Sequence, residues 1–422
     1  MNRKQLVTLL VLGLVLGGLG VLAYKKRQNP YEESIRGMGE KVVPNFPIND
    51  VASITLKTRD ASVNLAKKDD VWTVQERGGY PANFNNISEL LRKVWDLKVT
   101  SPVRVGPSRL PQLELLPPDK SPSTLVEFKK ADGKPVTSLL LGAKHMKEGR
   151  GDSQFGGGSF PDGRYVMVGT NLQTIALVSE PFTSAEPKPQ DWLHKEWFKV
   201  ERLKSISVVS TNGSNTWHVA RESETNDWKV VDLKPGEQPD SGKITSVTGA
   251  LSYPSFNDIA TNTAPEHTGM NQPTATAKLE TLDGFVYDVK VGGKTGEDYF
   301  VQVATSGNIQ KERTPGKDEK PDDKDKLDKE FKEKREKQEE KLKNEKAFGT
   351  WTYVVSKWTI DPLLKERKDL LQEKKEEPQT TEKKEESKPA AETKPGADFL
   401  NLPKVDATAK PEPKPESKPE GK

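Results

Sequence analysis

A series of short patterns occurs twice in this chain, in the same order, and this repetition limits the fold more than any other feature. The matched pairs are residues 51–54 (VASI) with 203–206 (LKSI), 71–74 (VWTV) with 227–230 (DWKV), 116–118 (LPP) with 270–273 (MNQP), 132–133 with 283–284 (both DG), 139–142 (LLLG) with 289–292 (VKVG), 165–168 (YVMV) with 300–303 (FVQV), and 176–179 (ALVS) with 353–356 (YVVS). Internal repetition is the signature of a duplicated structural unit. We therefore expect two homologous modules in tandem, at residues 46–196 and 197–372.

Each module is expected to be an α+β unit built mainly from strands. Alternating apolar residues, such as Ile54 with Leu56, are typical of half-buried strands, and each Asp-Gly pair predicts a hairpin turn. Apolar residues then recur at helical spacing after the third strand of each module; they are Ile87, Leu90, Leu91 and Val94 in the first, and Ile244, Val247 and Leu251, after a cap at Asp240 or Ser241, in the second. The predicted order is three strands, a helix and four more strands.

A highly charged insert interrupts the second module at residues 310–348. Opposite charges at helical spacing predict a solvated helix; the pairs are Glu330 with Lys334, Glu333 with Lys337, and Glu339 with Lys343. Because the segment has no continuous apolar stripe, we interpret it as a surface protrusion, with a coiled-coil partner helix as the alternative. A last helix is expected near residues 361–372. The tail at residues 373–422 is rich in Lys, Glu and Pro and is predicted to be disordered.

The N-terminus contains an uncharged run from Leu6 to Tyr24. As a helix, this run spans roughly the 30 Å thickness of the hydrocarbon layer of a bilayer. A cleaved signal peptide is the alternative, but its apolar region is typically about 7 to 15 residues long and ends in small residues. We therefore expect an uncleaved transmembrane signal anchor at residues 1–27, followed by a polar stalk at residues 28–45. Basic residues flank the run on both sides, so their distribution does not fix the orientation of the helix.

The charge balance and the absence of cysteine argue against several classes of site. The chain has 66 basic and 63 acidic residues, with a formal net charge of +3, and so lacks the basic excess that supplies most of the affinity for nucleic acid. With no cysteine, the chain has no disulfide, thiolate nucleophile, iron–sulfur cluster or cysteine-ligated zinc.

No pattern in the sequence identifies a reactive or ligand-binding residue. The four histidines, His145, His194, His218 and His267, occur singly, without the spacing of metal ligands on one helix. Residues 292–295 (GGKT) end like a phosphate-binding loop, but a strand follows them instead of a helix, so we interpret them as a hairpin turn. The Gly-rich residues 149–163 are interpreted as a long loop between two strands. We therefore predict no catalytic, cofactor-binding or metal-binding residue, and no cofactor.

Trp72 and Trp228 occupy equivalent positions in the two modules. Strand alternation places Trp72 on the same face as Val74, and Trp228 on the same face as Val230. We predict two core tryptophans, each packed beneath the helix of its module, with a pair of exposed aromatic binding platforms as the alternative.

Several of these patterns resemble those of a bacterial family known as domain of unknown function 4340. They are F-x-I-x-x-V-x-S-I at 46–54, Y-P-A-N at 80–83, a G-L-x-x-P segment at 115–118 (LLPP) and, more closely, at 269–273 (GMNQP), and a strand ending in L-G at 141–142. The resemblance covers roughly residues 46–310 and 349–372. It implies an N-terminal anchor, a location outside the cytoplasm and an association with auxiliary ABC transporters of the gliding-motility type. The family has no catalytic residue that could be assigned to this chain.

We expect a non-enzymatic accessory or binding protein, held in the cytoplasmic (inner) membrane of a bacterium by a single helix, with most of the chain in the periplasm. Its expected partners are the membrane and an ABC transporter permease or another envelope protein; nucleic acid is not expected. Two alternatives are a hydrolase that uses residues 143–164 as a lid, and a structural protein whose charged tail associates with cell wall or anionic lipid. The sequence leaves open whether the modules pack together or swing on the connection at residues 185–197.

Overall fold

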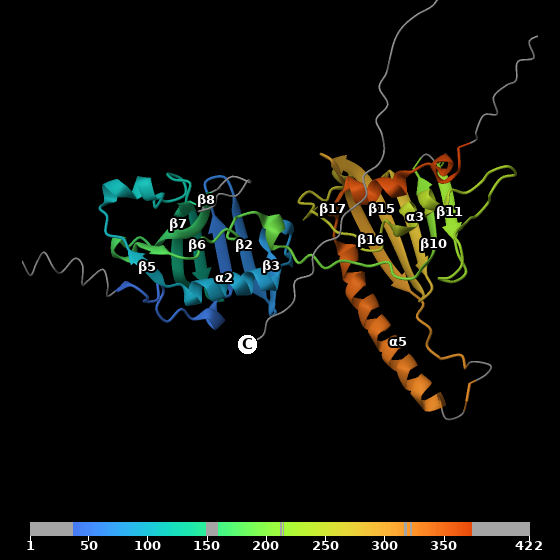
Figure 1. Ribbon diagram of the computed structural model, residues 1–422, viewed down its shortest axis with the longest axis horizontal. Coiled ribbons are helices and arrows are strands. Elements are labelled where there is room, and N and C mark those ends of the chain that lie inside the picture. The colour runs from blue at the N-terminus through green and yellow to red at the C-terminus, as the bar shows by residue number, and fades with distance from the viewer. Residues whose placement is uncertain are drawn as a thin grey trace, which may run out of the picture. The chain divides into compact units, whose positions relative to one another are not determined.

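Two antiparallel sheets and a small number of helices make up the described part of the chain, as the computed structural model in Figure 1 shows. The structure describes residues 37–148, 159–211, 213, 215–315, 319–320 and 323–373. Within these residues, no helix has both the length and the apolar character needed to span a bilayer. The predicted anchor at 1–27, part of the stalk and nearly all of the tail lie outside the described residues, so those predictions are untested.

The first sheet has nine strands in the order β4-β3-β2-β1-β6-β7-β8-β9-β5. The strands are β1 (Ser53–Lys57), β2 (Ser62–Lys68), β3 (Val71–Val74), β4 (Tyr80–Pro81), β5 (Val99–Pro102), β6 (Thr124–Lys129), β7 (Pro135–Glu148), β8 (Ser159–Val168) and β9 (Ala176–Val178). The connections contain the 3₁₀ helices η1 (Ile48–Asp50), η2 (Gln75–Arg77), η3 (Pro107–Leu113), η4 (Leu172–Thr174) and η5 (Pro189–Trp192).

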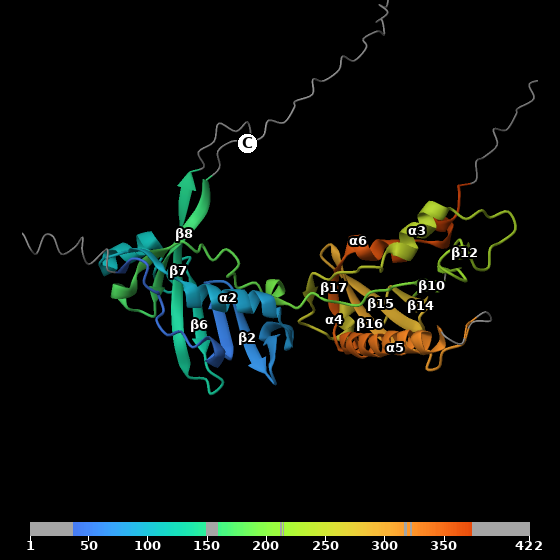
Figure 2. The ribbon, with the colours of Figure 1, turned by 60° about the horizontal axis from the view of Figure 1, so that its bottom comes forward.

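Helix α2 (Phe84–Asp96) lies against this sheet (Figure 2). It begins after Asn83, whose side chain accepts hydrogen bonds from two backbone N–H groups in the first turn. The four apolar residues predicted for its inner face, from Ile87 to Val94, are all buried. The sequence prediction of this helix and of its buried face is therefore confirmed.

The second sheet has eight strands in the order β12-β11-β10-β14-β15-β16-β17-β13. The strands are β10 (Leu203–Ser210), β11 (Thr216–Ala220), β12 (Lys229–Val230), β13 (Asp258–Ile259), β14 (Ala275–Thr281), β15 (Phe285–Thr295), β16 (Asp298–Gly307) and β17 (Tyr353–Ser356). The helices are α3 (Ser241–Gly249), α4 (Pro265–Thr268), α5 (Lys324–Lys346), α6 (Lys357–Ile360), and the 3₁₀ helices η7 (Ala347–Thr350), η8 (Asp361–Leu364) and η9 (Arg367–Leu370). Asp240 caps α3, one of the two caps that the sequence suggested.

The two sheets share one strand order once β4 is set aside. Each has three strands, then a helix, then five strands, where the sequence predicted four. The additional strands are β5 and β13, which are short and lie at a sheet edge, so they lack the alternation on which a sequence prediction depends. The single helix expected near 361–372 is instead the pair η8 and η9, because the backbone at Lys365 between them is extended.

The prediction that a strand ends at Gly142 is wrong, because β7 continues to Glu148, but a glycine lies at the same place in each sheet for a structural reason. A Cβ at Gly142 in β7 would lie 2.2 Å from the carbonyl oxygen of Leu113, and one at Gly292 in β15 would lie 2.2 Å from that of Thr268. Each carbonyl belongs to the last residue of a short helix, η3 before β6 and β7 and α4 before β14 and β15. Each glycine lies within a shift in register of its strand. Both glycines are therefore required by a close approach of backbone to backbone.

Two predicted turns have a different structure. Residues 292–295 belong to the end of β15, and the turn comes after Thr295, which pairs with Asp298. The Gly-rich loop predicted at 149–163 is shorter than expected: β7 continues to Glu148, and β8 already begins at Ser159, so residues 159–163 are strand. Figure 2 shows these two strands projecting together from the first sheet. The glycine content of the segment indicated a loop, but residues at both of its ends pair with each other as strands, as in the pair of Glu148 with Ser159.

The two equivalent tryptophans differ in burial. Trp72 is 5% exposed and belongs to the hydrophobic core, as predicted. Trp228 is only half-buried, and the guanidinium of Arg221 lies 4.5 Å from its ring centroid. Because β12 contains only Lys229 and Val230, Trp228 lies just outside the strand. It packs against the core without being fully buried, so the prediction of two core tryptophans is confirmed for Trp72 and only in part for Trp228.

The glycine contacts predict that Gly142→Ala and Gly292→Ala each destabilise the protein, by roughly 1 to 3 kcal/mol, as over-packing of a core typically does. Thermal unfolding followed by calorimetry measures the effect. Gly249→Ala is the matched control, because a Cβ there meets nothing within 4 Å and alanine favours the helix. Unchanged melting of both strand variants would contradict the close approach.

Candidate functional site

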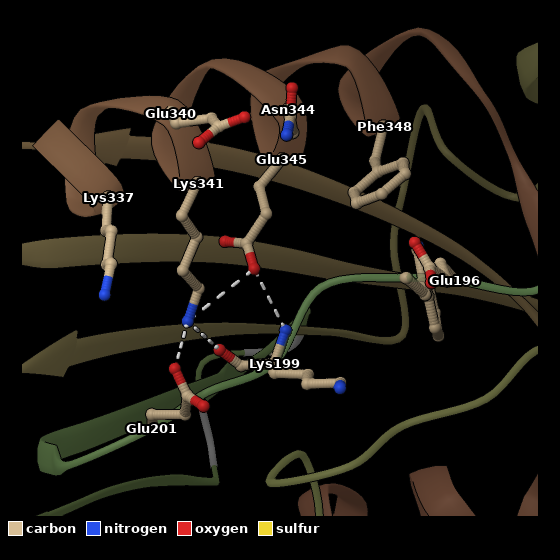
Figure 3. A pocket seen from close by; sticks show the side chains of 10 residues that line it. Glu196, Lys199, Glu201, Lys337, Glu340, Lys341, Asn344, Glu345 and Phe348 are labelled. Atoms are coloured by element: carbon tan, nitrogen blue, oxygen red, sulfur yellow. Dashed lines mark hydrogen bonds and ion pairs between the residues drawn. The ribbon is translucent and has the colours of Figure 1, made fainter.

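A buried polar cluster of the second sheet lies where α5 meets the segment that leads into β10. This lead-in segment, residues 196–201, and the C-terminal half of α5 enclose an open pocket of about 400 Å³. Figure 3 shows the side chains of Glu345 and Lys341 pointing from α5 toward the lead-in segment. We call these two residues, with Tyr287, Lys199 and Glu201, the Glu345 site.

Glu345 is the buried acid of this site, with a side chain that is 7% exposed. One carboxylate oxygen accepts a hydrogen bond from the backbone N–H of Lys199 at 3.2 Å, and the other accepts from the hydroxyl of Tyr287 at 2.8 Å. Burial raises the pKa of Glu345, although the Tyr287 hydrogen bond and the Lys341 ammonium oppose the shift. The same burial, with Glu345 nearby, raises the pKa of Tyr287.

Lys341 joins the helix to the lead-in segment a second time. Its ammonium donates to the carbonyl oxygen of Lys199 at 3.0 Å and to a carboxylate oxygen of Glu201 at 2.6 Å (Figure 3). It also lies 3.8 Å from Glu345, one turn further along the helix. Both the N–H and the C=O of Lys199 are therefore held by α5.

The docked part of α5 differs from the surface protrusion that the sequence predicted. Positions that are at least half-buried recur every three or four residues along one side of the helix; they are Leu327, Phe331, Arg335, Gln338, Leu342 and Glu345. Leu342 and the following Phe348 pack against the core. The inward stripe was not visible as an apolar pattern because Arg335, Gln338 and Glu345 are polar.

The intrahelical charge pairs also differ from those predicted. The pairs in the structure have the reverse order, with the cation before the acid. Besides Lys341 with Glu345, described above, they are Lys326 with Glu330, Lys329 with Glu333, and Arg335 with Glu339. The side chains of these last pairs are exposed or half-exposed, and such pairs contribute only a few tenths of a kcal/mol each. Docking through Glu345 and Leu342, more than surface charge, therefore fixes the helix.

The lead-in segment also contacts an aromatic cluster at the junction of the two sheets. Tyr80 of β4 has ring centroids of Trp351, Phe256 and Tyr353 within 5.1 to 6.2 Å, and Trp197 lies 4.7 Å from Tyr353. Burial raises the pKa of Tyr80 to about 12, so it is a neutral phenol at physiological pH. The two predicted modules therefore pack together within the described residues.

A bidentate ion pair closes the same junction. Arg77 of η2 donates to both carboxylate oxygens of Asp258 in β13, at 2.6 and 2.7 Å. Nearby, the ammonium of Lys195 donates to the carbonyl oxygens of Phe256 and Asn257, and burial lowers its pKa. Planar arginine–carboxylate pairs of this kind fix orientation as well as distance.

The Glu345 site is arranged to hold the chain's own backbone. Both oxygens of Glu345 accept hydrogen bonds from protein groups, and the Tyr287 hydroxyl also lies 3.1 Å from the carbonyl oxygen of Lys199. A general acid must instead present its proton to a substrate within hydrogen-bonding distance. The geometry therefore favours docking of α5 over proton transfer to a ligand.

The structure keeps the four histidines apart. His145 lies 2.6 Å from Asp162, His194 lies 3.5 Å from Glu196, His218 is in β11, and His267 packs against Phe300. Among the described residues, no group of three or more potential ligands has the arrangement of a metal site. The predictions of no catalytic, cofactor or metal residue stay predictions.

One sequence signal could have located the lead-in segment. The pattern of residues 46–54 recurs at 198–206, where Phe198, Val200 and Leu203 take the places of Phe46, Ile48 and Val51. Phe46 packs edge-on against Phe128, and Phe198 packs against Tyr287. Each phenylalanine thus precedes the first strand of its sheet and packs against an aromatic residue of that sheet. Lys199, whose N–H donates to Glu345, directly follows Phe198.

Comparison with known proteins identifies one family. Residues 72–273 match a family described as "Domain of unknown function (DUF4340)". The match begins in β3 and ends just before β14, so it includes parts of both sheets and the junction between them. No curated protein matches the chain.

Two substitutions of Glu345 distinguish the effect of its charge on stability from the effect of its hydrogen bonds. Glu345→Ala removes the acceptor of the Lys199 N–H and one of the two acceptors of the Tyr287 hydroxyl, and it should destabilise the protein by about 1 to 3 kcal/mol. Glu345→Gln retains an acceptor and removes the titration. Because the pKa of Glu345 is raised on folding, ionisation opposes folding, so the stability of the wild type relative to Glu345→Gln should rise as the pH falls from 8 toward 4.5.

Calorimetric melting temperatures across this pH range measure the difference. Glu340→Gln, on an exposed position of the same helix, is the matched control and should show no such trend. A wild-type melting temperature that falls relative to Glu345→Gln on acidification would contradict the assigned direction.

Proposed function

Since residues 72–273 place this chain in the DUF4340 family, we propose that it is a membrane-anchored accessory protein that binds a partner in the cell envelope and is not itself an enzyme. In this proposal the uncharged run from Leu6 to Tyr24 holds the chain in the inner membrane, and both sheets lie in the periplasm. The expected partner is the permease of an ABC-type transport system, as the family resemblance implies.

The observation that carries this proposal is the difference between two otherwise similar sheets. The β15–β16 hairpin closes directly after Thr295 pairs with Asp298, whereas the β7–β8 hairpin continues to the pair of Glu148 with Ser159. The extended part exposes Met146 and Phe160 to about half of their full areas. Function is carried by features added to a scaffold, and exposed apolar side chains on a projecting feature support contact with another protein.

We include in the proposal that the two sheets arose by duplication. Their shared strand order supports this, as do the equivalent glycines and register shifts in β7 and β15. A further correspondence links the segment before the first strand to the Asp-Gly hairpin. Asp50 bonds Lys130 at 2.8 Å in the first sheet, and Arg202 bonds Asp283 at 2.6 Å in the second, with the charges reversed.

The Glu345 site supports a binding role in a second way. The polar groups of α5 are directed at the backbone of the lead-in segment, next to the aromatic junction of the two sheets. A helix docked there stiffens the junction. Stiffening of this kind suits a protein that must present a surface in a fixed orientation.

The topology is tested by protease accessibility. We expect protease added to spheroplasts to degrade the chain from the stalk onward, leaving a membrane-embedded N-terminal fragment. A cytoplasmic protein of the same cells, probed on the same blot, controls for lysis. Protection of residues 46–422 until the membrane is disrupted would contradict the proposed location.

The binding role is tested by shortening the projecting hairpin. The variant joins His145 to Gly163 through the two turn residues of the second sheet, Gly296 and Glu297, in place of residues 146–162. We expect it to melt as the wild type does, because the removed pairs lie beyond the core, and to lose the permease that purifies with the wild type in mild detergent. The matched control carries Val71→Ser, which removes a similarly exposed apolar side chain (51% exposed) from β3 and should retain the permease. Retention of the permease by the shortened variant would exclude this surface.

A further inference from the structure

The outer parts of β7 and β8 form a two-stranded ribbon with open edges. The pairing of β6 with β7 ends at Leu141, and the pairing of β9 with β8 ends at Arg164. Beyond these points the described residues of β7, Lys144 to Glu148, pair only with those of β8. A ribbon of two strands is marginally stable by itself in water, and an open strand edge is a template for pairing with another chain.

Pro161 determines which edge of the ribbon can accept a strand. It pairs with Met146, and because proline has no N–H, the two residues cannot exchange a pair of backbone hydrogen bonds. The N–H and C=O of Met146 therefore point away from β8, toward the open edge of β7. The open edge of β8 lacks a donor at its centre, at Pro161 itself.

We propose that the open edge of β7 pairs with the same edge of a second copy of this chain, antiparallel and centred on Met146. A two-fold axis through the paired Met146 residues makes this contact isologous and closed. The overlap from Lys144 to Glu148 is about 17 Å long at the usual rise per residue. Met146, now 48% exposed, then packs against its counterpart, whereas Phe160, on the other face of the ribbon, keeps its exposure for the partner of the proposed function.

The charges along β7 favour a second copy of the chain as the partner that pairs with this edge. In this register Lys144 of each copy lies directly opposite Glu148 of the other, so two pairs of opposite charge flank the central methionines. Lys147 lies opposite His145, whose imidazole is bonded to Asp162 of its own ribbon at 2.6 Å. A shift by two residues in either direction removes both of the Lys144 and Glu148 pairs, so charge complementarity fixes the register.

The absence of cysteine from the chain makes the contact directly measurable. In full-length protein in native membranes, Met146→Cys should form a disulfide-linked dimer on mild oxidation, because directly paired strand residues have the Cα separation that a disulfide requires. Ser159→Cys is the matched control, since Ser159 is exposed in the same ribbon but lies on β8, where it pairs with Glu148. Absence of the Met146→Cys dimer, or equal dimer from the two variants, would overturn the proposal.

Charge reversal tests the register. In the Met146→Cys background, Lys144→Glu and Glu148→Lys should each lower the rate of dimer formation roughly tenfold, because each replaces two attractive pairs with two repulsive ones. The double variant, Lys144→Glu with Glu148→Lys, restores opposite charges and should restore the wild-type rate. Single variants without effect, or a double variant as slow as the single ones, would show that the copies meet in another way.

Discussion

Each sheet of this protein has one face of alternating apolar side chains, and the need to cover that face governs the rest of the structure. In β1 the buried residues are Ile54 and Leu56, and in β10 they are Leu203, Ile206 and Val208. Helix α2 covers much of the first face, while the shorter α3 covers less of the second. The lead-in phenylalanines and, in the second sheet, the end of α5 supply the remaining cover. The polar helix α5 thus packs against the second sheet because a few of its side chains cover the part of the buried face that α3 does not cover.

The features predicted correctly from the sequence are those set by local patterns. Ile87 to Val94 have helical spacing, and the Asp-Gly pairs at 132 and 283 form the turns between β6 and β7 and between β14 and β15. Local patterns failed where the determining contact is distant. Gly142 is required because a Cβ at this position would lie 2.2 Å from the carbonyl oxygen of Leu113. Residues up to Glu148 and from Ser159 are strand because they pair with each other, although their composition is typical of a loop.

The candidate site was beyond sequence reasoning for a related reason. Glu345 lies in a segment where almost every residue is charged, and its burial depends on Tyr287 and the backbone of Lys199, which are far away in the chain. The same holds for Arg77, whose partner Asp258 belongs to the other sheet. A charged residue reveals a structural role only when the fold supplies both a partner and shelter from water.

The insertion of α5 between β16 and β17 also has a consequence for the order of folding. In the first sheet, β8 ends at Val168 and β9 begins at Ala176, so their pairing closes a short loop. In the second sheet the chain leaves at Gly307 and returns at Tyr353, and the same pairing joins residues that are far apart in sequence. Closing a longer loop loses more chain entropy, and contacts of high sequence separation slow folding. The two sheets therefore share a topology but not a contact order, and the second sheet completes its far edge, β17 and β13, later than the first completes β9 and β5.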